Sequence, residues 1–223
     1  MTPLILAVDT TREYGSLALA RDGEVMEEAL LHSPSGFAHV LFGALEDILR
    51  RAAVKIEQID LFASASGPGS FTGVRIGLSF AKGLAEAAGK PAVAVSNLRA
   101  LASLGSGALR VPLLDARRGE IYGAVYGGSG ELVCEEGVAS PSAWLERLPA
   151  GDLEFVCVDE AFARCVLAGT AFEGSRVTVA PQSLAGAIAR IAADDFAGGR
   201  ATDPAALDAN YVRRSDAELF WKG

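Results

Sequence analysis

Residues 6–20 read LAVDTTREYGSLALA, and a similar pattern, VPLLDARRGEIYGAVY, returns at residues 111–126. Each copy predicts an apolar strand, a turn that begins at an aspartate and a second strand, followed by a glycine turn and a third strand. Three pairs of residues correspond at an offset close to half the chain: Asp9 and Asp115, Gly15 and Gly123, and Gly23 and Gly130. The sequence therefore predicts a duplicated antiparallel meander.

Helices and strands alternate after each meander. The first half predicts helices at 35–53, 71–88 and 98–104, with strands between them at 59–66 and 91–95. The second half repeats this order with elements at 141–148, 155–159, 161–168, 176–179 and 183–193. We therefore predict an α/β protein of two lobes, 1–104 and 105–223, each with a mixed sheet and flanking helices. Residues 210–215, NYVRRS, are expected to form an ordered strap within the second lobe.

The bulk composition limits the possible functions. The chain has 223 residues, half of them apolar, which is enough for two modest cores. A net charge of −8 opposes a broad phosphate-neutralising surface, so RNA is expected to be reached only through a partner. The sequence contains no apolar run of transmembrane length and no leader, so we expect the cytoplasm and no membrane contact. Cys134, Cys157 and Cys165 lack metal spacing and are expected to be reduced core thiols.

The glycine-rich segment GPGSFTGVRIG at residues 67–77 lies at a predicted junction of strand and helix, with Ser70 as the N-cap. Glycines at such a junction can free backbone N–H groups to bind phosphate at the positive end of a helix. The segment lacks Gly-Lys-Ser/Thr, which excludes a P-loop, and Thr72 stands where a dinucleotide fingerprint needs its third glycine.

Small residues recur at every fourth position from this segment onward, at Gly69, Gly73, Gly77, Ala81 and Ala85. One flank of the predicted helix therefore carries almost no side chain, and another part of a protein could approach it closely. Spacing alone leaves three interpretations open: a helix contact within the chain, which it favours, a contact with another protein, and a phosphate cradle.

Strand-ending aspartates are the best candidates for chemistry. Asp9 is followed by Thr10 and Thr11, and Asp115 holds the equivalent place in the second lobe. Such carboxylates in a cleft could hold Mg²⁺ or a nucleotide, but they also commonly form Asx turns. Neither turn is rich in glycine, so bulky side chains oppose the close approach of phosphate. His32 and His39 do not form a convincing metal pair, and no serine or threonine has a visible base, so no catalytic residue is assigned.

With these features in view, the chain resembles the bacterial TsaB family over essentially its whole length. The resemblance rests on AVDTT at 7–11, GPGSFTGVRIG at 67–77, DARRGEIY at 115–122 and YVRRS at 211–215. It implies an actin-like ATPase (ASKHA, ribonuclease H-like) fold whose own nucleotide cleft, at Asp9, Thr10, Thr11 and Asp115, is vestigial.

The resemblance also implies a paralogue of TsaD, the enzyme that transfers a threonylcarbamoyl group to adenosine 37 of tRNAs that read codons beginning with A. The His-x-x-x-His metal motif of that enzyme corresponds here to Ser35 and His39, so one ligand is missing. A non-catalytic scaffold and activator is therefore expected, with no metal and no cofactor of its own, while partner proteins use ATP.

The partners implied by the resemblance are TsaD, in a heterodimer, the ATPase TsaE, and a second copy of the chain, in a homodimer. In the family, two helices of the first lobe form the contact, which raises the intermolecular interpretation of the bare flank above the intramolecular one. The expected interface residues are Phe37, Leu41, Gly69, Gly73, Gly77 and Ala81. Gly36-Phe37-Ala38 departs from relatives that place a histidine and a hydroxyl residue there. An autonomous ATP-dependent kinase is the alternative function, and a peptidase a weaker one.

Overall fold

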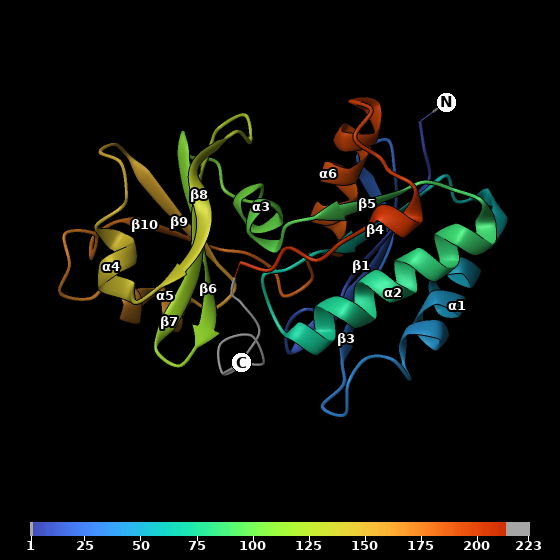
Figure 1. Ribbon diagram of the computed structural model, residues 1–223, viewed down its shortest axis with the longest axis horizontal. Coiled ribbons are helices and arrows are strands. Elements are labelled where there is room, and N and C mark those ends of the chain that lie inside the picture. The colour runs from blue at the N-terminus through green and yellow to red at the C-terminus, as the bar shows by residue number, and fades with distance from the viewer. Residues whose placement is uncertain (1, 213–223) are drawn as a thin grey trace, which may run out of the picture. The chain divides into compact units, whose positions relative to one another are not determined.

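The computed structural model describes residues 2–212, which form two compact units (Figure 1). The first unit comprises the residues up to Asn97 together with Gln182–Asn210, and the second comprises Leu98–Pro181. Within residues 2–212, no helix is both long and apolar enough to cross a bilayer. Residues 213–215 of the predicted strap lie outside the described residues.

The first half of the chain contains β1 (Ile5–Asp9), β2 (Tyr14–Arg21), β3 (Glu24–His32), α1 (Leu41–Ala52), η1 (Ile56–Gln58), β4 (Leu61–Ala65), α2 (Phe71–Ala88), β5 (Ala92–Val95) and α3 (Asn97–Ala102). The second half contains β6 (Leu109–Arg117), β7 (Glu120–Gly127), β8 (Leu132–Ala139), α4 (Pro141–Leu145), β9 (Leu153–Cys157), α5 (Glu160–Leu167), β10 (Arg176–Val179), α6 (Ala185–Ala197) and η2 (Pro204–Ala206). Apart from the two short 3₁₀ helices, the two halves have the same order of elements.

The two sheets have the same topology, which confirms the predicted duplication. The first has the strand order β3-β2-β1-β4-β5, and the second has the matching order β8-β7-β6-β9-β10. In both, the first three strands are antiparallel and the last two run parallel to the central strand. Two mixed five-stranded sheets in this repeated order form the predicted actin-like, ribonuclease H-like fold.

The division into units differs from the predicted boundary between 1–104 and 105–223. Helix α6 lies in the second half of the sequence, yet it packs against β1, β2, β4 and β5 of the first sheet. Its N-terminus has no side-chain cap of its own. Instead, Ser16 Oγ accepts a hydrogen bond from Ala185 N at 3.1 Å, and Glu28 Oε1 accepts one from Gly186 N at 3.2 Å. These strand side chains fix the helix on the first unit.

Helices cover both faces of the first sheet (Figure 1). Residues of β2 alternate in direction, so Leu17 and Leu19 join the core beneath α1 and α2, whereas Ser16 faces α6. The buried residues of α6 are mainly alanine and glycine, with Ile188 and Ile191 as the large apolar ones. In the second unit, α4 and α5 bury Trp144, Leu145, Val166 and Leu167 against the sheet.

Helix α2 occupies the residues predicted for it. Ser70 Oγ accepts a hydrogen bond from Gly73 N, and Gly89, in a left-handed conformation at φ 62°, ends the helix. The predicted helix at 35–53 begins only at Leu41. Gly36 has φ 96° and its carbonyl oxygen accepts a hydrogen bond from Ser33 Oγ, so the preceding residues form turns instead.

Candidate functional site

The glycine flank of α2 packs against the chain's own turn between β1 and β2. Thr10 Oγ1 donates a hydrogen bond to Gly73 O at 2.7 Å, and Ser70 N donates one to Thr11 O at 2.7 Å. A β-carbon at Gly69 would lie 2.6 Å from Thr11 O, and one at Gly77 would lie 2.7 Å from Thr10 Oγ1. The small residues are therefore required for this contact within the unit.

The predicted partner interface must be corrected at this flank. Gly73, Gly77 and Ala81 are buried inside the first unit, and Gly69 is half-buried under the Thr11 backbone. Spacing alone favoured a contact with another helix of the chain; the contact in the structure is within the chain, but the partner of the flank is the turn between β1 and β2. Raising the intermolecular interpretation above it was wrong for these residues.

Phe37 and Leu41, the other two predicted interface residues, belong to the core beneath α1 and α2. The ring of Phe37 packs over Gly15, where a β-carbon would lie 2.8 Å from Phe37 Cε1. Leu41 is the first of the core-facing residues of α1, followed by Leu45 and Ile48. Both predicted residues line pockets, but neither presents a large exposed surface.

An apolar groove lies beside these residues, between α1 and the first half of α2. Its volume is 610 Å³, and it is lined by Ala38, Leu41, Phe42, Phe71, Thr72, Arg75, Ile76, Ser79 and Phe80. Phe42 is 60% exposed and Phe71 is 41% exposed. Phe42 meets Phe80 edge to face with 5.2 Å between ring centroids, and the Arg75 guanidinium lies 3.8 Å from the centroid of Phe71. We call these lining residues the α1–α2 groove.

Sequence reasoning missed Phe42 and Phe71, although a signal for Phe42 was present. The buried residues of α1 are Leu41, Leu45 and Ile48, which follow helical spacing. Phe42 is not one of these buried positions, so its large apolar side chain points away from the core and contacts solvent. One exposed phenylalanine is ordinary, but two that line the same groove, Phe42 and Phe71, are typical of a contact surface.

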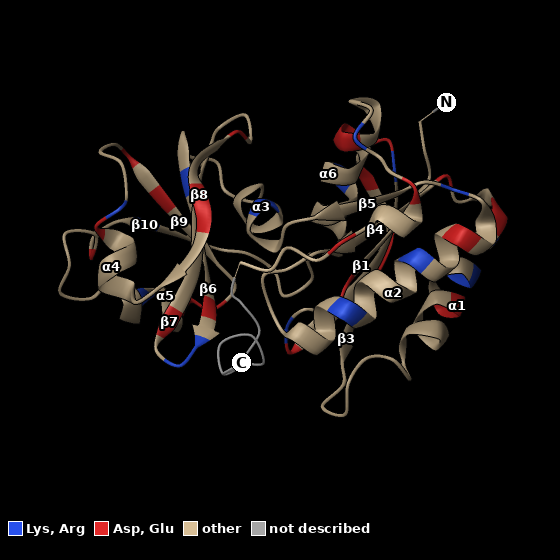
Figure 2. Ribbon diagram, in the orientation of Figure 1, with Lys and Arg blue, Asp and Glu red and all other residues tan. Residues whose placement is uncertain are grey.

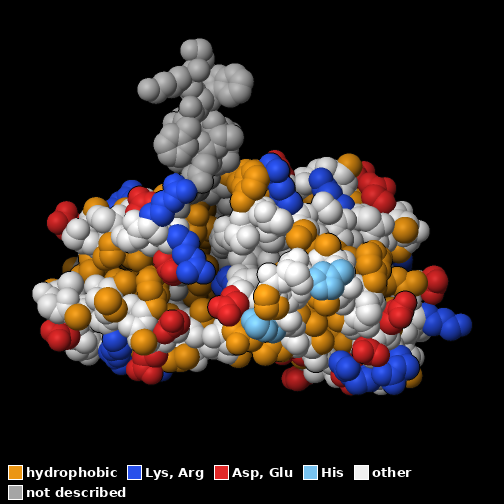
Figure 3. All heavy atoms as spheres, turned by 90° about the horizontal axis from the view of Figure 1, so that it is seen from below, with side chains coloured by type: hydrophobic (Ala, Val, Ile, Leu, Met, Phe, Trp, Pro, Cys, Tyr) orange, Lys and Arg blue, Asp and Glu red, His pale blue; other side chains and the backbone are white. Residues whose placement is uncertain are grey.

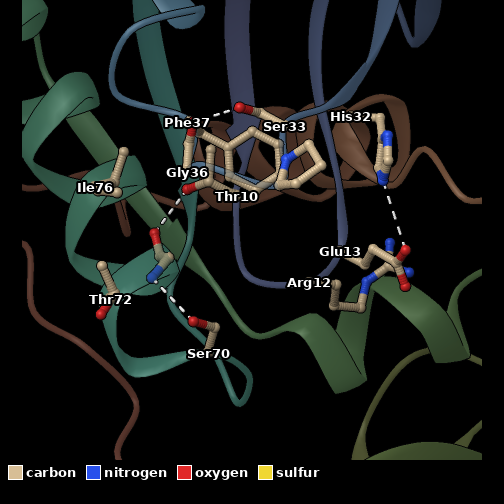
Figure 4. Close-up of a pocket in the computed structure, with 12 residues that line it drawn as sticks. Thr10, Arg12, Glu13, His32, Ser33, Gly36, Phe37, Ser70, Thr72 and Ile76 are labelled. Atoms are coloured by element: carbon tan, nitrogen blue, oxygen red, sulfur yellow. Dashed lines mark hydrogen bonds and ion pairs between the residues drawn. The ribbon is translucent and has the colours of Figure 1, made fainter.

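A second pocket, of 340 Å³, lies at the N-terminal end of α2 (Figure 4). One side is formed by Ser70, Thr72 and Gly73, and on the other His32 Nε2 lies 3.5 Å from Glu13 Oε1. His39 Nε2 instead lies 3.4 Å from Ser33 Oγ, so the two histidines have different partners. Both lie on one face of the molecule among hydrophobic side chains (Figure 3).

Asp9, by contrast, is fully buried and held by its own chain. Its Oδ1 accepts hydrogen bonds from Thr11 N at 2.9 Å and from Thr11 Oγ1 at 2.6 Å. Asn97 Nδ2 lies 3.4 Å from the same oxygen and 2.8 Å from Thr11 Oγ1. The side chain of Asp9 therefore forms the Asx turn that was the alternative to a nucleotide site.

Asp115 forms the same kind of turn, because its Oδ1 accepts a hydrogen bond from Arg117 N at 2.7 Å. Unlike Asp9, it is exposed. The duplicated aspartates thus keep the same local geometry with different burial, and neither favours the alternative of an ATP-dependent kinase. Across residues 2–212, no three His, Cys, Asp or Glu side chains gather as a metal site would need.

Arg75 is the one charged residue among those that line the α1–α2 groove. Figure 2 shows two basic positions along α2 and an acidic position toward its C-terminal end, and it shows both acidic and basic positions in α1. The two basic positions are Arg75 and Lys82, the only Lys or Arg in α2. A mainly apolar surface with a stacked arginine can bind another protein's apolar helix surface.

Comparison with known proteins agrees with this fold. The family model described as TsaD, tRNA N6-adenosine threonylcarbamoyltransferase, matches residues 35–196. A solved structure of YeaZ from Pseudomonas aeruginosa is similar at a TM-score of 0.78 and 26% identity, over 94% of this chain and 99% of that chain.

Several curated relatives carry the name tRNA threonylcarbamoyladenosine biosynthesis protein TsaB. The protein of Escherichia coli (strain K12) is 41% identical over 126 residues, which are 55% of this chain and 54% of that protein. The protein of Bacillus subtilis (strain 168) is 34% identical over 153 residues, which are 66% of this chain and 67% of that protein. The alignments thus span between about half and two thirds of these relatives. The TsaD family model, which covers well over half of the chain, fits a paralogue of that enzyme, and the two relatives show that the chain belongs to the TsaB family.

Proposed function

We propose that this protein acts in the synthesis of threonylcarbamoyladenosine at position 37 of tRNAs that read codons beginning with A. It does so as a non-catalytic scaffold and activator in the cytoplasm. It binds a TsaD-type transferase through the α1–α2 groove, and tRNA and the ATPase TsaE join through that complex. A second copy of the chain occupies the same groove when the transferase is absent, which gives a homodimer.

The observation that carries the proposal is the exposed aromatic surface of the groove. Phe42 and Phe71 are large apolar side chains in contact with solvent on the first unit, and both line the 610 Å³ groove. Aromatic residues beside a stacked arginine are the types that contribute most to binding between proteins. The partner surface therefore consists of Phe42, Phe71 and Arg75. The glycines of α2 contact the turn between β1 and β2 and are not part of this surface.

The state of Asp9 supports the absence of catalysis. Catalysis on a phosphate or a carbonyl group needs a nucleophile, a base or a metal ligand that can reach a substrate. The Asp9 carboxylate is fully buried and accepts hydrogen bonds from its own turn. The chemistry is therefore assigned to the partner, and this chain contributes binding energy and positioning.

A binding experiment with a matched control tests the proposal. Phe42→Asp places a charge in the groove, and Leu30→Asp places the same charge on an apolar residue of β3 that is 53% exposed and outside the groove. We expect Phe42→Asp to weaken binding to the purified transferase by about 30-fold or more, the effect of losing a central aromatic contact. Leu30→Asp should bind like the unaltered chain.

Modification of tRNA gives the second readout. In a reaction reconstituted from the transferase, TsaE, ATP, threonylcarbamoyl-adenylate as the group donor and tRNA, threonylcarbamoyladenosine should form only when this chain is present, and Phe42→Asp should reduce the yield. Equal binding by both variants would show that the groove is not the partner surface. Modification by this chain without any other protein would contradict the non-catalytic role.

A further inference from the structure

The carboxylate of Asp9 has one satisfied oxygen and one that lacks a hydrogen bond. Its Oδ1 accepts from Thr11, while its Oδ2 is buried with no hydrogen-bond partner. The positive group beside Oδ2 is the guanidinium of Arg12, whose NH2 lies 3.6 Å away. A buried carboxylate needs such a charge, because removing an ion from water without compensation is costly.

Arg12 is held at this position by contacts other than the ion pair. Its side chain is only 13% exposed. NH2 donates a hydrogen bond to Gln182 O at 2.7 Å, and NH1 donates one to Gln182 Oε1 at 3.2 Å. Gln182 immediately precedes the segment that leads into α6, within the first unit. The guanidinium is therefore fixed by a second part of the unit and does not depend on Asp9 alone.

This arrangement does not fit a metal-bound nucleotide at the end of β1. A hard divalent cation binds oxygen ligands and would need a carboxylate oxygen that faces it. Asp9 Oδ2 faces Arg12. Asp9 Oδ1 is already in contact with Thr11 and Asn97. A phosphate group would also need room at Thr10, whose hydroxyl donates to Gly73 O on α2.

We propose that Arg12 is a built-in counter-ion that takes the place of a divalent cation beside Asp9. The positive charge is then present in every molecule, so the turn between β1 and β2 keeps its geometry without nucleotide or metal. Thr10 and Thr11 of this turn contact the glycine flank of α2. The charge that stabilises the turn therefore also stabilises the position of α2. The inference is independent of the proposed partner binding.

Three variants test the proposal: Arg12→Ala, Asp9→Asn/Arg12→Ala and Arg12→Gln. Removing the guanidinium alone should lower the Tm by roughly 6 to 20 °C, the usual consequence of leaving a buried charge unpaired. The double variant has no such charge and should recover much of this loss. Arg12→Gln retains hydrogen-bonding capacity without charge, so it reports on the charge if Arg12→Ala fails to fold.

Binding of Mn²⁺ distinguishes a counter-ion from a merely structural residue. Electron paramagnetic resonance of free Mn²⁺ should show weak binding, at millimolar Mn²⁺, for Arg12→Ala or Arg12→Gln, whose Asp9 carboxylate lacks its counter-ion, and none for the unaltered protein or the double variant. Millimolar Mn²⁺ should also raise the Tm of the single variants only. The proposal is overturned if the single variants bind no Mn²⁺, if the unaltered chain binds it, or if Asp9→Asn fails to recover the Tm.

Discussion

The carbonyl oxygen of Thr10 occupies the space that a β-carbon would need at Gly73. Gly73 lies in the first turn of α2, and Thr10 lies in the turn after β1, so two segments far apart in sequence meet with backbone against backbone. Thr10 Oγ1 also donates to Gly73 O at 2.7 Å. Any side chain at position 73 must move the helix or the turn, which makes this glycine a structural requirement of the first unit.

Gly73→Ala should therefore destabilise the protein. The added methyl group meets a backbone oxygen that cannot move aside, so we expect a loss of about 3 kcal/mol, the upper part of the usual range for overpacking. Urea denaturation followed by circular dichroism measures this free energy of unfolding.

Gly83→Ala is the matched control for this prediction. Gly83 lies in the same helix, is exposed, and has nothing within 4 Å of the position of an added β-carbon. Alanine is there the better helix former, so the variant should be more stable by about 0.5 to 1 kcal/mol. Equal effects of the two substitutions would show that the Thr10 contact is not close in solution.

Glu154 of β9 is a buried carboxylate that holds the loop before β6. Its Oε2 accepts hydrogen bonds from Ser106 N at 2.6 Å and Gly107 N at 2.5 Å, and its Oε1 accepts one from Thr178 Oγ1 at 2.5 Å. Burial raises the pKa of Glu154, but these donors and the charge of Arg176 outweigh burial and lower the pKa below its ordinary value. The ionised form is thus favoured in the folded protein.

Glu154→Gln should cost about 2 kcal/mol at neutral pH, because an amide NH₂ would face groups that are themselves donors. Since the folded pKa is lowered, the ionised carboxylate stabilises the protein above the ordinary pKa of 4.5, and this stabilisation disappears as the pH falls through the folded pKa. The unfolding curves of the two proteins should therefore differ at pH 7 and converge in acid. A difference that stays constant down to pH 3 would contradict this account.

The cysteines should react in the order of their exposure. Burial raises the pKa of Cys157 to about 11, so almost no thiolate is present at pH 8. Cys165 is exposed, which corrects the expectation of a core thiol, because α5 turns Ala163, Val166 and Leu167 toward the core instead. Iodoacetamide followed by peptide mass spectrometry should find Cys165 modified first and Cys157 only after unfolding. Early modification of Cys157 would contradict its burial.

Local patterns predicted the elements of this protein well. The bounds of α2 could be predicted because Ser70 caps the helix and Gly89 ends it, and both residues are next to the helix in sequence. The duplicated sheet could be predicted for the same reason, since each meander repeats its pattern of strands and turns. Elements whose start and end are determined by neighbouring residues are the ones that a single sequence reveals.

The contacts between distant segments could not be predicted in this way. The glycine flank signals a close approach, but nothing in its spacing identifies Thr10 as the group that approaches. The core position of Phe37 depends on Gly15, and the counter-charge of Asp9 is fixed by Gln182, more than a hundred residues away. A pattern of small residues thus reports that a surface is covered, while the identity of what covers it depends on the tertiary fold.

The assignment of α6 to the first unit leads to a prediction about Ser16. This buried serine on β2 accepts the hydrogen bond of Ala185 N at 3.1 Å, and α6 has no cap from its own sequence. Ser16→Ala should cost about 1 to 2 kcal/mol, because it leaves a buried N–H at a helix start without an acceptor. Hydrogen exchange should accelerate most at the first amides of α6. Ser79→Ala, at an exposed serine of α2, should leave the exchange of those amides unchanged. If the two variants exchange the first amides of α6 at the same rate, α6 does not depend on Ser16 for its attachment.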